Sequence, residues 1–295
     1  MCCLFGIIDC KKTFSPRQKN RLMSALATAA EERGTDATGI AYNEGSNLQI
    51  YKRPKAGHRM SFELPGSIGT TIIGHTRLTT QGNADKNYNN HPFRGNISNH
   101  QFALAHNGVI WNDDCIKESF SLPKSFIETD SFIAVQLLER NKSLNFDSLK
   151  FMAEQLRGSF TFTILDDKDN LYIVKGENPL CIYYYADKDI YVYASTEQIL
   201  KAALKKFKMR GRKETVQLHD GDILRISSKG KCDWSHFNQC NAYDYGFFDY
   251  EDFYQEESYL EDLKFVASTM GYDPNDIDFL LEQGLTLEEI EEFLY

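Results

Sequence analysis

The sequence lacks long apolar runs, secretory features and regular cysteine spacing. No apolar stretch approaches the roughly 18 to 20 residues that a membrane-spanning helix needs, so we expect no membrane association. No basic segment stands ahead of a long apolar stretch at the N-terminus, so we expect no secretory signal. The seven cysteines are odd in number and irregularly spaced, which argues against a disulfide framework and favours the reducing cytoplasm.

The cysteines also lack the arrangement of a metal site. There is no CxxC pair, although Cys232, His236 and Cys240 follow each other at intervals of four. Structural zinc usually takes four ligands, and a catalytic zinc keeps an open position. We therefore treat this spacing as coincidence, and we expect neither a metal nor a cofactor.

The charge that is present is distributed unevenly along the 295 residues. Residues 241–295 hold sixteen Asp and Glu against one Lys, a net charge of -15, whereas residues 1–240 hold 26 acids against 32 Lys and Arg, a net charge of +6. Such asymmetry indicates a separate C-terminal unit. The composition, 42% hydrophobic and 25% charged, is that of a globular chain that can bury a core.

Apolar periodicity predicts short strands and a few amphipathic helices. Helices are expected from Ser15-Pro16 to about Glu32 and at residues 129–138, 146–156 and 196–204. Strands are expected at residues 4–8, 40–42, 48–51, 72–75, 102–105, 160–165, 171–174, 181–185, 191–194, 216–218 and 222–226. Residues 83–101 are polar and rich in turn formers. Helices interleaved with hairpins predict a layered α+β fold rather than a doubly wound parallel sheet.

The chain begins Met1-Cys2-Cys3, and a cysteine after the initiator methionine can become the N-terminus because methionine removal favours a small second residue. Cys2 would then carry a thiol with a reference pKa of roughly 8.5 and an α-amine of roughly 7.7 to 8. One residue would supply both a nucleophile and a base. Alternatively, residues 4–8 are a plain core strand preceded by a buried cysteine.

Five segments, in this order, resemble those of the class II glutamine amidotransferase domain of the N-terminal nucleophile hydrolases. They are residues 2–7, 33–39, 74–82 with Gly74-His75-Thr76-Arg77, 106–110 with His106-Asn107-Gly108, and 128–130 with Glu128-Thr129-Asp130. The resemblance covers about residues 2–228 and implies the four-layer αββα fold. We therefore expect this domain at 2–228, an aromatic and acidic connecting segment at 229–255, and a small acidic helical unit at 256–295.

The resemblance implies a glutaminase site. Cys2 would attack the side-chain amide of glutamine, and its own α-amine would relay the proton. Asn107 and Gly108 would stabilise the oxyanion, and Arg33 would favour the thiolate. Arg77 and Thr80 would bind the α-carboxylate, and Asp130 the α-ammonium. Without the resemblance, Arg77 and Asp130 are ordinary surface charges, Thr80 is a turn residue, and Asn107-Gly108 predicts a tight turn.

The sequence departs from the family pattern at three positions. Cys3 replaces the glycine usual after the nucleophile and adds a second thiol, Leu78 stands where an aromatic is common, and Gln81 stands where a histidine occurs in the sugar-phosphate enzyme. His75, His91 and His106 are expected to be structural, because the α-amine already supplies the base.

About 67 residues follow Ser228, and they show no phosphate-binding Gly-rich loop, no ATP-pyrophosphatase signature and no Lys-based sugar site. We therefore expect a glutaminase that supplies ammonia to a protein partner in trans, and no nucleic acid or membrane partner. Three short helices are expected at residues 258–270, 276–283 and 286–293. They would either dock a partner or cap the core or its basic residues between Lys201 and Lys213.

Two alternatives to the glutaminase stay open on sequence alone. Cys3 and the missing acceptor domain also fit a regulatory protein that senses glutamine on the same fold without turning it over. An N-terminal-cysteine amidase acting on another amide is the other alternative, but Arg77 and Asp130 match the two charges of a free amino acid. Retention of Met1 would block the α-amine and exclude catalysis by this route.

Overall fold

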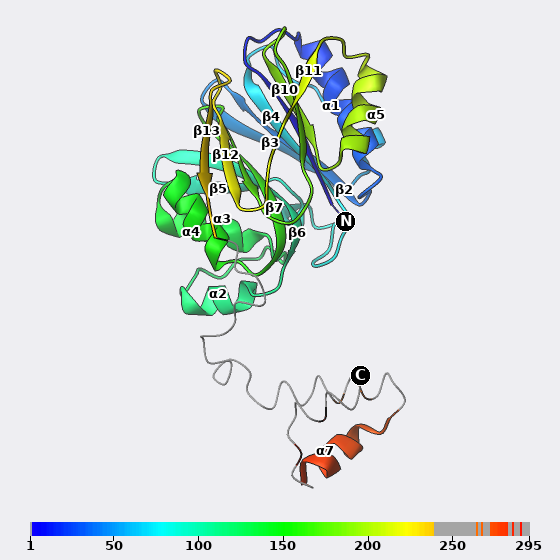
Figure 1. The fold of residues 1–295 in the computed structure, drawn as a ribbon, viewed down its shortest axis with the longest axis vertical. Coiled ribbons are helices and arrows are strands. Elements are labelled where there is room, and N and C mark those ends of the chain that lie inside the picture. Colours follow the sequence, from blue (N-terminus) through cyan, green and yellow to red (C-terminus); the bar gives the residue numbers. More distant parts are fainter. Residues whose placement is uncertain are drawn as a thin grey trace. The chain divides into compact units, whose positions relative to one another are not determined.

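The computed structural model describes residues 2–238, 264, 267, 272–282, 285 and 290. The chain divides into two units, Met1–Cys240 and Asn241–Tyr295, and each is described by itself. The first unit begins with a central strand whose seven residues are all buried, β1 (Cys3–Asp9), and it holds the predicted site residues (Figure 1).

One antiparallel sheet has the strand order β11-β9-β10-β1-β4-β2-β3. Its strands after β1 are β2 (Ala37–Glu44), β3 (Asn47–Arg53), β4 (Ile68–Arg77), β9 (Cys181–Tyr185), β10 (Ile190–Ala194) and β11 (Lys213–Val216). All ten residues of β4 are buried, as expected of a central strand covered on both faces. The second sheet therefore packs on one face of this sheet and helices on the other.

The second antiparallel sheet has the order β13-β12-β8-β7-β6-β5. Its strands are β5 (Phe93–Ile97), β6 (His100–Ile110), β7 (Gly158–Asp166), β8 (Leu171–Lys175), β12 (Asp222–Ile226) and β13 (Cys232–His236). The longest pairing joins β6 and β7 over nine residues of each strand. Asn107 and Gly108 lie inside β6, so the tight turn that their sequence predicts in isolation is wrong.

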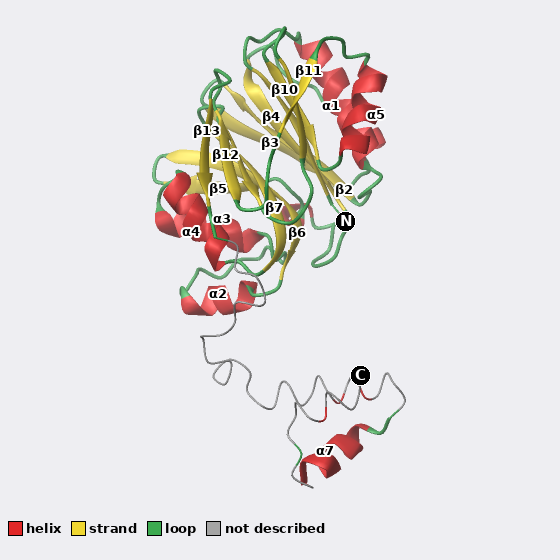
Figure 2. Ribbon diagram, viewed as in Figure 1, coloured by secondary structure: helices red, strands yellow, loops and turns green. Residues whose placement is uncertain are grey.

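Helices cover the outer faces of the two sheets and complete four layers (Figure 2). Helices α1 (Pro16–Ala30) and α5 (Glu197–Phe207) lie on the first sheet, whereas α3 (Phe132–Asn141) and α4 (Phe146–Gln155) lie on the second. Three apolar cores separate the layers, and the middle one, between the sheets, includes Leu4, Ile73 and Ala105. The predicted αββα fold is confirmed.

Local signals place the start of α1 as the sequence predicts. The Ser15 side chain accepts from the Gln18 backbone N–H while the Gln18 side chain accepts from the Ser15 N–H, and Pro16 occupies the first helical position. The buried face of α1 includes Leu22 and Leu26 at helical spacing. Together these interactions fix the helix directly after the turn that follows β1.

Several elements differ from the sequence prediction. Strand β5 lies in the stretch predicted to be turns, and β13 lies in the segment predicted to be irregular. Helix α2 (Asp113–Ser119) and the short 3-10 turns Gly57–Arg59 and Asn87–Asn89 were not predicted. The strand predicted at 216–218 is β11, three residues earlier. Because β13 pairs with β12, the first unit extends past the expected limit at residue 228 to Cys240.

In the second unit, the structure describes one helix with defined bounds, α7 (Pro274–Glu282), where the middle of the three acidic helices was predicted. Ala267, Ile277 and Ile290 form a small buried apolar cluster. The predicted helices at 258–270 and 286–293 and most of the connecting segment at 229–255 lie outside the described residues. None of the helices in the described part of the chain is long and apolar enough to cross a bilayer.

Candidate active site

Cys2 lies at the start of the central strand. In the antiparallel pairing of β1 with β4, Cys3 stands opposite Thr76, which brings Cys2 beside Arg77 at the end of β4. The Cys2 Sγ lies 3.5 Å from the carbonyl oxygen of Leu78, and the Cys2 carbonyl oxygen accepts a 2.8 Å hydrogen bond from Arg33 Nε. The backbone after β4 therefore holds the thiol, and the loop after α1 holds the main chain of this half-buried residue.

The charges around Cys2 have opposite signs. Burial raises the pKa of the Cys2 thiol, the positive charge of Arg77 lowers it, and the negative charge of Asp130 raises it. Burial likewise lowers the pKa of Arg77, while the charges of Cys2, Asp36 and Asp130 raise it. Because burial is the largest influence, the thiol is protonated near neutral pH and needs a base before it attacks.

Arg77 is buried, and the protein fixes its guanidinium. Its Nη1 donates to Asn90 Oδ1 at 2.8 Å, and its Nη2 donates to the carbonyl oxygen of Gln81. A guanidinium has five N–H donors, so these contacts leave donors for a carboxylate. No role was predicted for the Asn90 side chain from the sequence.

Asp130 is buried, and both carboxylate oxygens are held. Oδ2 accepts from the Ile110 backbone N–H at 2.7 Å, and Oδ1 accepts from the Ser131 N–H at 2.7 Å and Ser131 Oγ at 3.1 Å. The Asp130 N–H donates to Gln81 Oε1 at 2.8 Å. Gln81 thus joins Arg77 and Asp130, which gives a structural role to a residue that the sequence marks only as a departure.

Asn107 reaches the central strand from the other sheet. Its Nδ2 donates to Ser195 Oγ at 3.3 Å, and the same Oγ accepts from the Leu4 N–H at 2.8 Å. Ser195 therefore connects Asn107 to a residue only two positions from Cys2. No role was predicted for Ser195 from the sequence.

Gly108 follows Asn107 in a backbone conformation that excludes side chains. Its φ is +142°, and a Cβ there would lie 1.9 Å from the Ser159 carbonyl oxygen and 2.7 Å from Asn178 Nδ2. The backbone of this residue is therefore fixed against β7, where only glycine fits.

Cys3 and Thr80 are placed differently from the residues above. Cys3 is fully buried in the apolar core under α1 and α5, and burial raises its pKa to about 11. Leu4 belongs to the core between the sheets, so adjacent residues of β1 face opposite layers. Thr80 is exposed in the loop after β4, without a hydrogen bond to another site residue within the described part of the chain.

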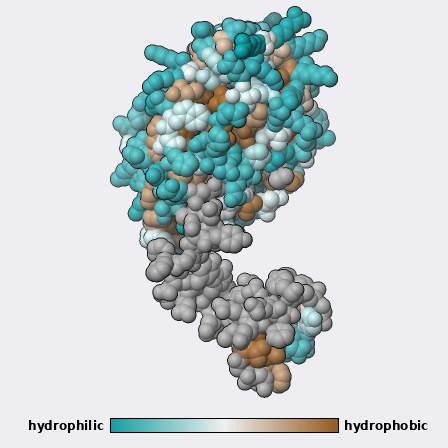
Figure 3. Space-filling view, viewed as in Figure 1, coloured by the Kyte–Doolittle hydropathy of each residue, from teal (hydrophilic) through white to brown (hydrophobic). Residues whose placement is uncertain are grey.

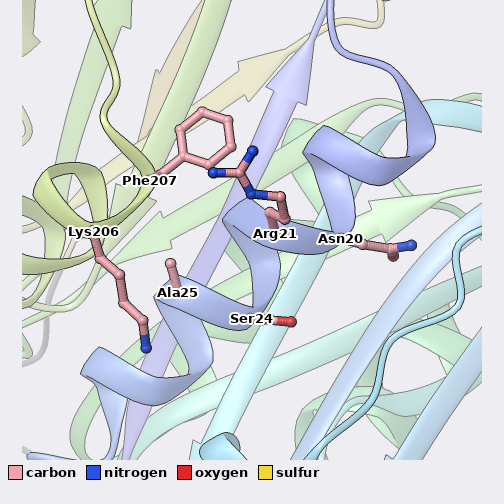
Figure 4. A pocket seen from close by; sticks show the side chains of 6 residues that line it. All are labelled: Asn20, Arg21, Ser24, Ala25, Lys206 and Phe207. Carbon is pink, nitrogen blue, oxygen red and sulfur yellow. The ribbon is translucent and has the colours of Figure 1, made fainter.

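Two cavities lie away from these residues. One, of about 380 Å³, lies between α1 and α5, where Arg21 extends toward the Phe207 ring at 5.7 Å (Figure 4). The other, of about 480 Å³, is lined by five cationic side chains, Lys201, Lys205, Lys208, Arg210 and Lys213, with apolar residues between them. Neither includes a thiol or a carboxylate in its lining, so neither offers amide chemistry.

The visible surface of the first unit is mainly hydrophilic, with small apolar patches (Figure 3). Exposed large apolar side chains are found beside the site residues in sequence. Leu78 follows Arg77, and Val109 and Trp111 follow Gly108. Within the described residues, no group of three His, Cys, Asp or Glu side chains is arranged to hold a metal ion; Cys240 lies outside them.

Comparisons with known proteins agree on the type of domain. Residues 75–202 match a family model described as a glutamine amidotransferase domain. The glutamine–fructose-6-phosphate aminotransferases (isomerizing) of Staphylococcus aureus and Streptococcus pneumoniae are each 35% identical to this chain, over 163 and 159 residues. Each alignment covers 52% of this chain and 26% of the relative, so the chain spans about a quarter of the length of these relatives.

Among solved structures, the glutamine phosphoribosylpyrophosphate amidotransferase from B. subtilis, complexed with ADP and GMP, superimposes with a TM-score of 0.63. It shares 23% identity, and the superposition covers 81% of this chain and 50% of that one. This likeness shows a common fold, and the sequence match at 75–202 lies within the unit that has this fold.

Proposed function

Because this chain contains a glutamine amidotransferase domain of the class II, N-terminal nucleophile type, we propose that it hydrolyses the side-chain amide of L-glutamine. The observation that carries the proposal is the position of Cys2, whose thiol lies where the charges of Arg77 and Asp130 both act on it. These two charges have opposite signs, as binding of the carboxylate and ammonium groups of one free amino acid requires.

The reaction begins when removal of Met1 frees the α-amine of Cys2. The amine takes the thiol proton, and Sγ attacks the amide carbon to form a tetrahedral oxyanion. The Asn107 side chain and the Gly108 N–H stabilise that oxyanion. The C–N bond breaks, the proton passes to the leaving nitrogen, and ammonia departs from a thioester. Water then attacks the thioester, which gives glutamate and restores the Cys2 thiol.

Substrate selection follows from the other end of glutamine. The free N–H donors of Arg77 bind the α-carboxylate, with the Thr80 hydroxyl nearby, and Asp130 binds the α-ammonium. Arg33, which donates to the Cys2 carbonyl oxygen, fixes the main chain of the nucleophile and adds positive charge near it.

Glutamate release from purified protein tests this function. Cys2→Ala removes the nucleophile and should reduce release to background. Cys3→Ala is the matched control, because the Cys3 side chain lies in the apolar core under α1 and α5, and this variant should retain most of the activity. Glutamate release that persists in Cys2→Ala would contradict the mechanism.

We further propose that the ammonia is passed to an acceptor protein in trans. The two curated relatives are about four times longer than the segment they share with this chain, so the acceptor half of the reaction need not lie here. The exposed Val109 and Trp111, which follow the oxyanion segment, and Leu78, which follows Arg77, suit burial against such a partner. If so, the partner should raise glutamate release, and Trp111→Ser should abolish that stimulation.

The acidic C-terminal unit is proposed to help dock that partner. Its small apolar cluster of Ala267, Ile277 and Ile290 supports a folded unit, and Phe279 of α7 is exposed. Phe279→Ser should weaken partner binding while glutamate release by the isolated chain stays unchanged.

The redox state of the cysteines bears on the compartment. Six cysteines of the described residues are free thiols, which supports a reducing, cytoplasmic location.

One observation favours a second candidate function, a glutamine sensor without turnover. Burial keeps the Cys2 thiol protonated, and if Met1 is retained, no α-amine is available to deprotonate it. Intact-mass measurement separates the two. Retained Met1 together with glutamine binding by calorimetry supports the sensor, and a mature chain that starts at Cys2 supports the enzyme.

A further inference from the structure

Three histidines, none of them used in the proposed reaction, are buried together beside the site. His75 on β4, His91 before Pro92 and His106 on β6 are each at most 4% exposed. The ring centroids of His75 and His91 are 4.3 Å apart, and those of His91 and His106 are 6.4 Å apart. Burial of a polar ring costs free energy unless its nitrogens are hydrogen-bonded, so the partners of each ring matter.

A directed chain of hydrogen bonds leads from this cluster to Asp130. His75 Nε2 lies 2.9 Å from the His106 carbonyl oxygen, and His106 Nδ1 lies 2.7 Å from Ser131 Oγ. Ser131 Oγ in turn donates to Asp130 Oδ1 at 3.1 Å. A carboxylate only accepts, so the Ser131 hydroxyl gives its single proton to Asp130 and must accept from His106.

The protonation state of each ring follows from this direction. His75 donates from Nε2, because a carbonyl oxygen cannot donate, and His106 donates from Nδ1. Burial lowers the pKa of His75 to about 3 and that of His106 to about 4, so both rings are neutral at pH 7 and carry one N–H each. His106 Nε2 is then an unprotonated nitrogen; it is buried without a hydrogen bond of normal geometry among the described residues, although a backbone contact with Ser159 raises the pKa of the ring.

We propose that His106 is a positioning residue for substrate selection: through Ser131 it holds the Asp130 carboxylate in the orientation that receives the α-ammonium of glutamine. This inference rests on the proposed function. The Ile110 N–H holds Oδ2, so the His106–Ser131 arm restrains the opposite oxygen, Oδ1. Together they stop the carboxylate from rotating when the substrate arrives.

The position of the ring nitrogens gives a sharp test. In His106→Asn the side-chain NH₂ can replace the Nδ1–H, whereas in His106→Gln it reaches the position of Nε2, where the ring has no hydrogen bond of normal geometry among the described residues. Ser131→Ala removes the link without touching the ring. His91→Phe is the matched control: it is equally buried, its two nitrogens are without partners among the described residues, and it is not part of the chain of hydrogen bonds.

The measured quantity is the kcat/KM for glutamine divided by the kcat/KM for glutaramate, which is the same amide without the α-amine. We expect His106→Gln and Ser131→Ala to lower this ratio about tenfold by raising the KM for glutamine. The loss of one hydrogen bond to a charged group weakens binding by about that factor. Glutaramate hydrolysis and kcat should change little. His106→Asn should recover most of the ratio, and His91→Phe should match the wild type.

Two different results overturn different claims. A folded, active Ser131→Ala protein whose ratio equals that of the wild type overturns the positioning role, and so does an equal loss for both substrates in His106→Gln and His106→Asn. Wild-type protein that starts at Cys2 and hydrolyses neither substrate overturns the proposed function itself. If the His106 variants do not fold, Ser131→Ala alone decides.

Discussion

The adjacent residues Cys2 and Cys3 carry the same thiol in different surroundings. Cys3 faces the apolar core under α1 and α5, where burial raises its pKa to about 11, while the charges of Arg77 and Asp130 act on the pKa of the Cys2 thiol. The alternation of side chains along a strand is the cause. The Cys3 thiol, whose presence next to the proposed nucleophile is a departure visible in the sequence, therefore faces away from the candidate site.

Asn107→Ala is expected to lower kcat for glutamine by about 10² to 10³, because one oxyanion donor is worth about 2.7 to 4 kcal/mol of barrier. The KM should change little, since the amide oxygen becomes an oxyanion only during the reaction. Steady-state glutamate release measures both parameters. A thermal melt is the control, because Asn107 also donates to Ser195. A kcat within twofold of the wild type would show that Asn107 does not stabilise the oxyanion.

Gly108→Ala is expected to destabilise the fold by more than about 2 kcal/mol, since its Cβ would collide with the Ser159 carbonyl oxygen at 1.9 Å and its φ is +142°. Gly45→Ala is the matched control, with φ +61° and no atom within 4 Å of the new Cβ. It should cost about 1 kcal/mol, from its left-handed backbone alone. Urea unfolding of both variants checks the difference, and equal costs would contradict the close approach at Gly108.

The candidate site residues were named from the sequence, because the proposed chemistry depends on residue type and order. The residues that orient them were not. Gln81 joins Arg77 to Asp130, which lies 49 residues from Gln81, and Ser195 joins Asn107 to Leu4, which lie 88 and 191 residues from Ser195. Contacts of that sequence separation depend on the pairing of whole strands, and a single sequence gives no local signal for them.

At the scale of elements, strands with a clear apolar run were predicted, whereas the two edge strands of the second sheet, β5 and β13, were not. In β5 the buried and exposed residues alternate, but its Gly95 and Asn96 resemble turn residues. In β13 no residue is fully buried, so pairing with β12, not burial, makes it a strand. Helix α2 was missed because only Ile116 among its apolar residues is buried.

The turn from β1 to α1 depends on a buried ion pair. Lys19 of α1 lies 3.4 Å from Asp9 at the end of β1, and Asp9 also accepts from the Thr13 and Phe14 N–H groups. Lys19→Met leaves Asp9 buried without its cation and should cost about 3 to 5 kcal/mol of unfolding free energy.

Lys201→Met provides the control for this prediction, because Lys201 pairs with Glu197 on the exposed face of α5 and the pair is solvated. It should cost less than about 1 kcal/mol. Denaturant unfolding compares the two variants. Similar costs for both would mean that the Lys19–Asp9 pair contributes no more than a surface pair.

At the scale of the whole molecule, the buried histidines make stability depend on pH. Burial lowers the pKa of His75 to about 3, of His106 to about 4, and of His91 well below its usual value. The unfolded chain, with pKa values near 6.5, therefore binds more protons than the native state in this range. The stabilisation is fully present above about pH 6.5 and is lost as the pH falls.

Each such histidine is expected to remove up to about 1.4 kcal/mol of unfolding free energy per pH unit below pH 6.5. Urea midpoints measured between pH 7.5 and pH 5 check this. The range stops at pH 5 because carboxyl groups with a raised pKa in the native state, such as Asp166, oppose the effect at lower pH. His91→Phe should make the slope shallower. A stability that does not change between pH 7 and pH 5 would contradict the neutral histidine cluster.

The most direct test of the central claim, that Cys2 is the nucleophile of a glutamine-hydrolysing site, is covalent trapping. The purified protein is treated with a glutamine analogue that carries an electrophilic carbon in place of the amide, and the adduct is located by peptide mass spectrometry. We predict one adduct per chain, on Cys2 at the N-terminus of a chain from which Met1 has been removed. Glutamine should protect Cys2 from labelling, and Arg77→Ala should slow the labelling. Labelling of Cys3 or Cys10 instead, or labelling of Cys2 that glutamine does not slow, would contradict the account.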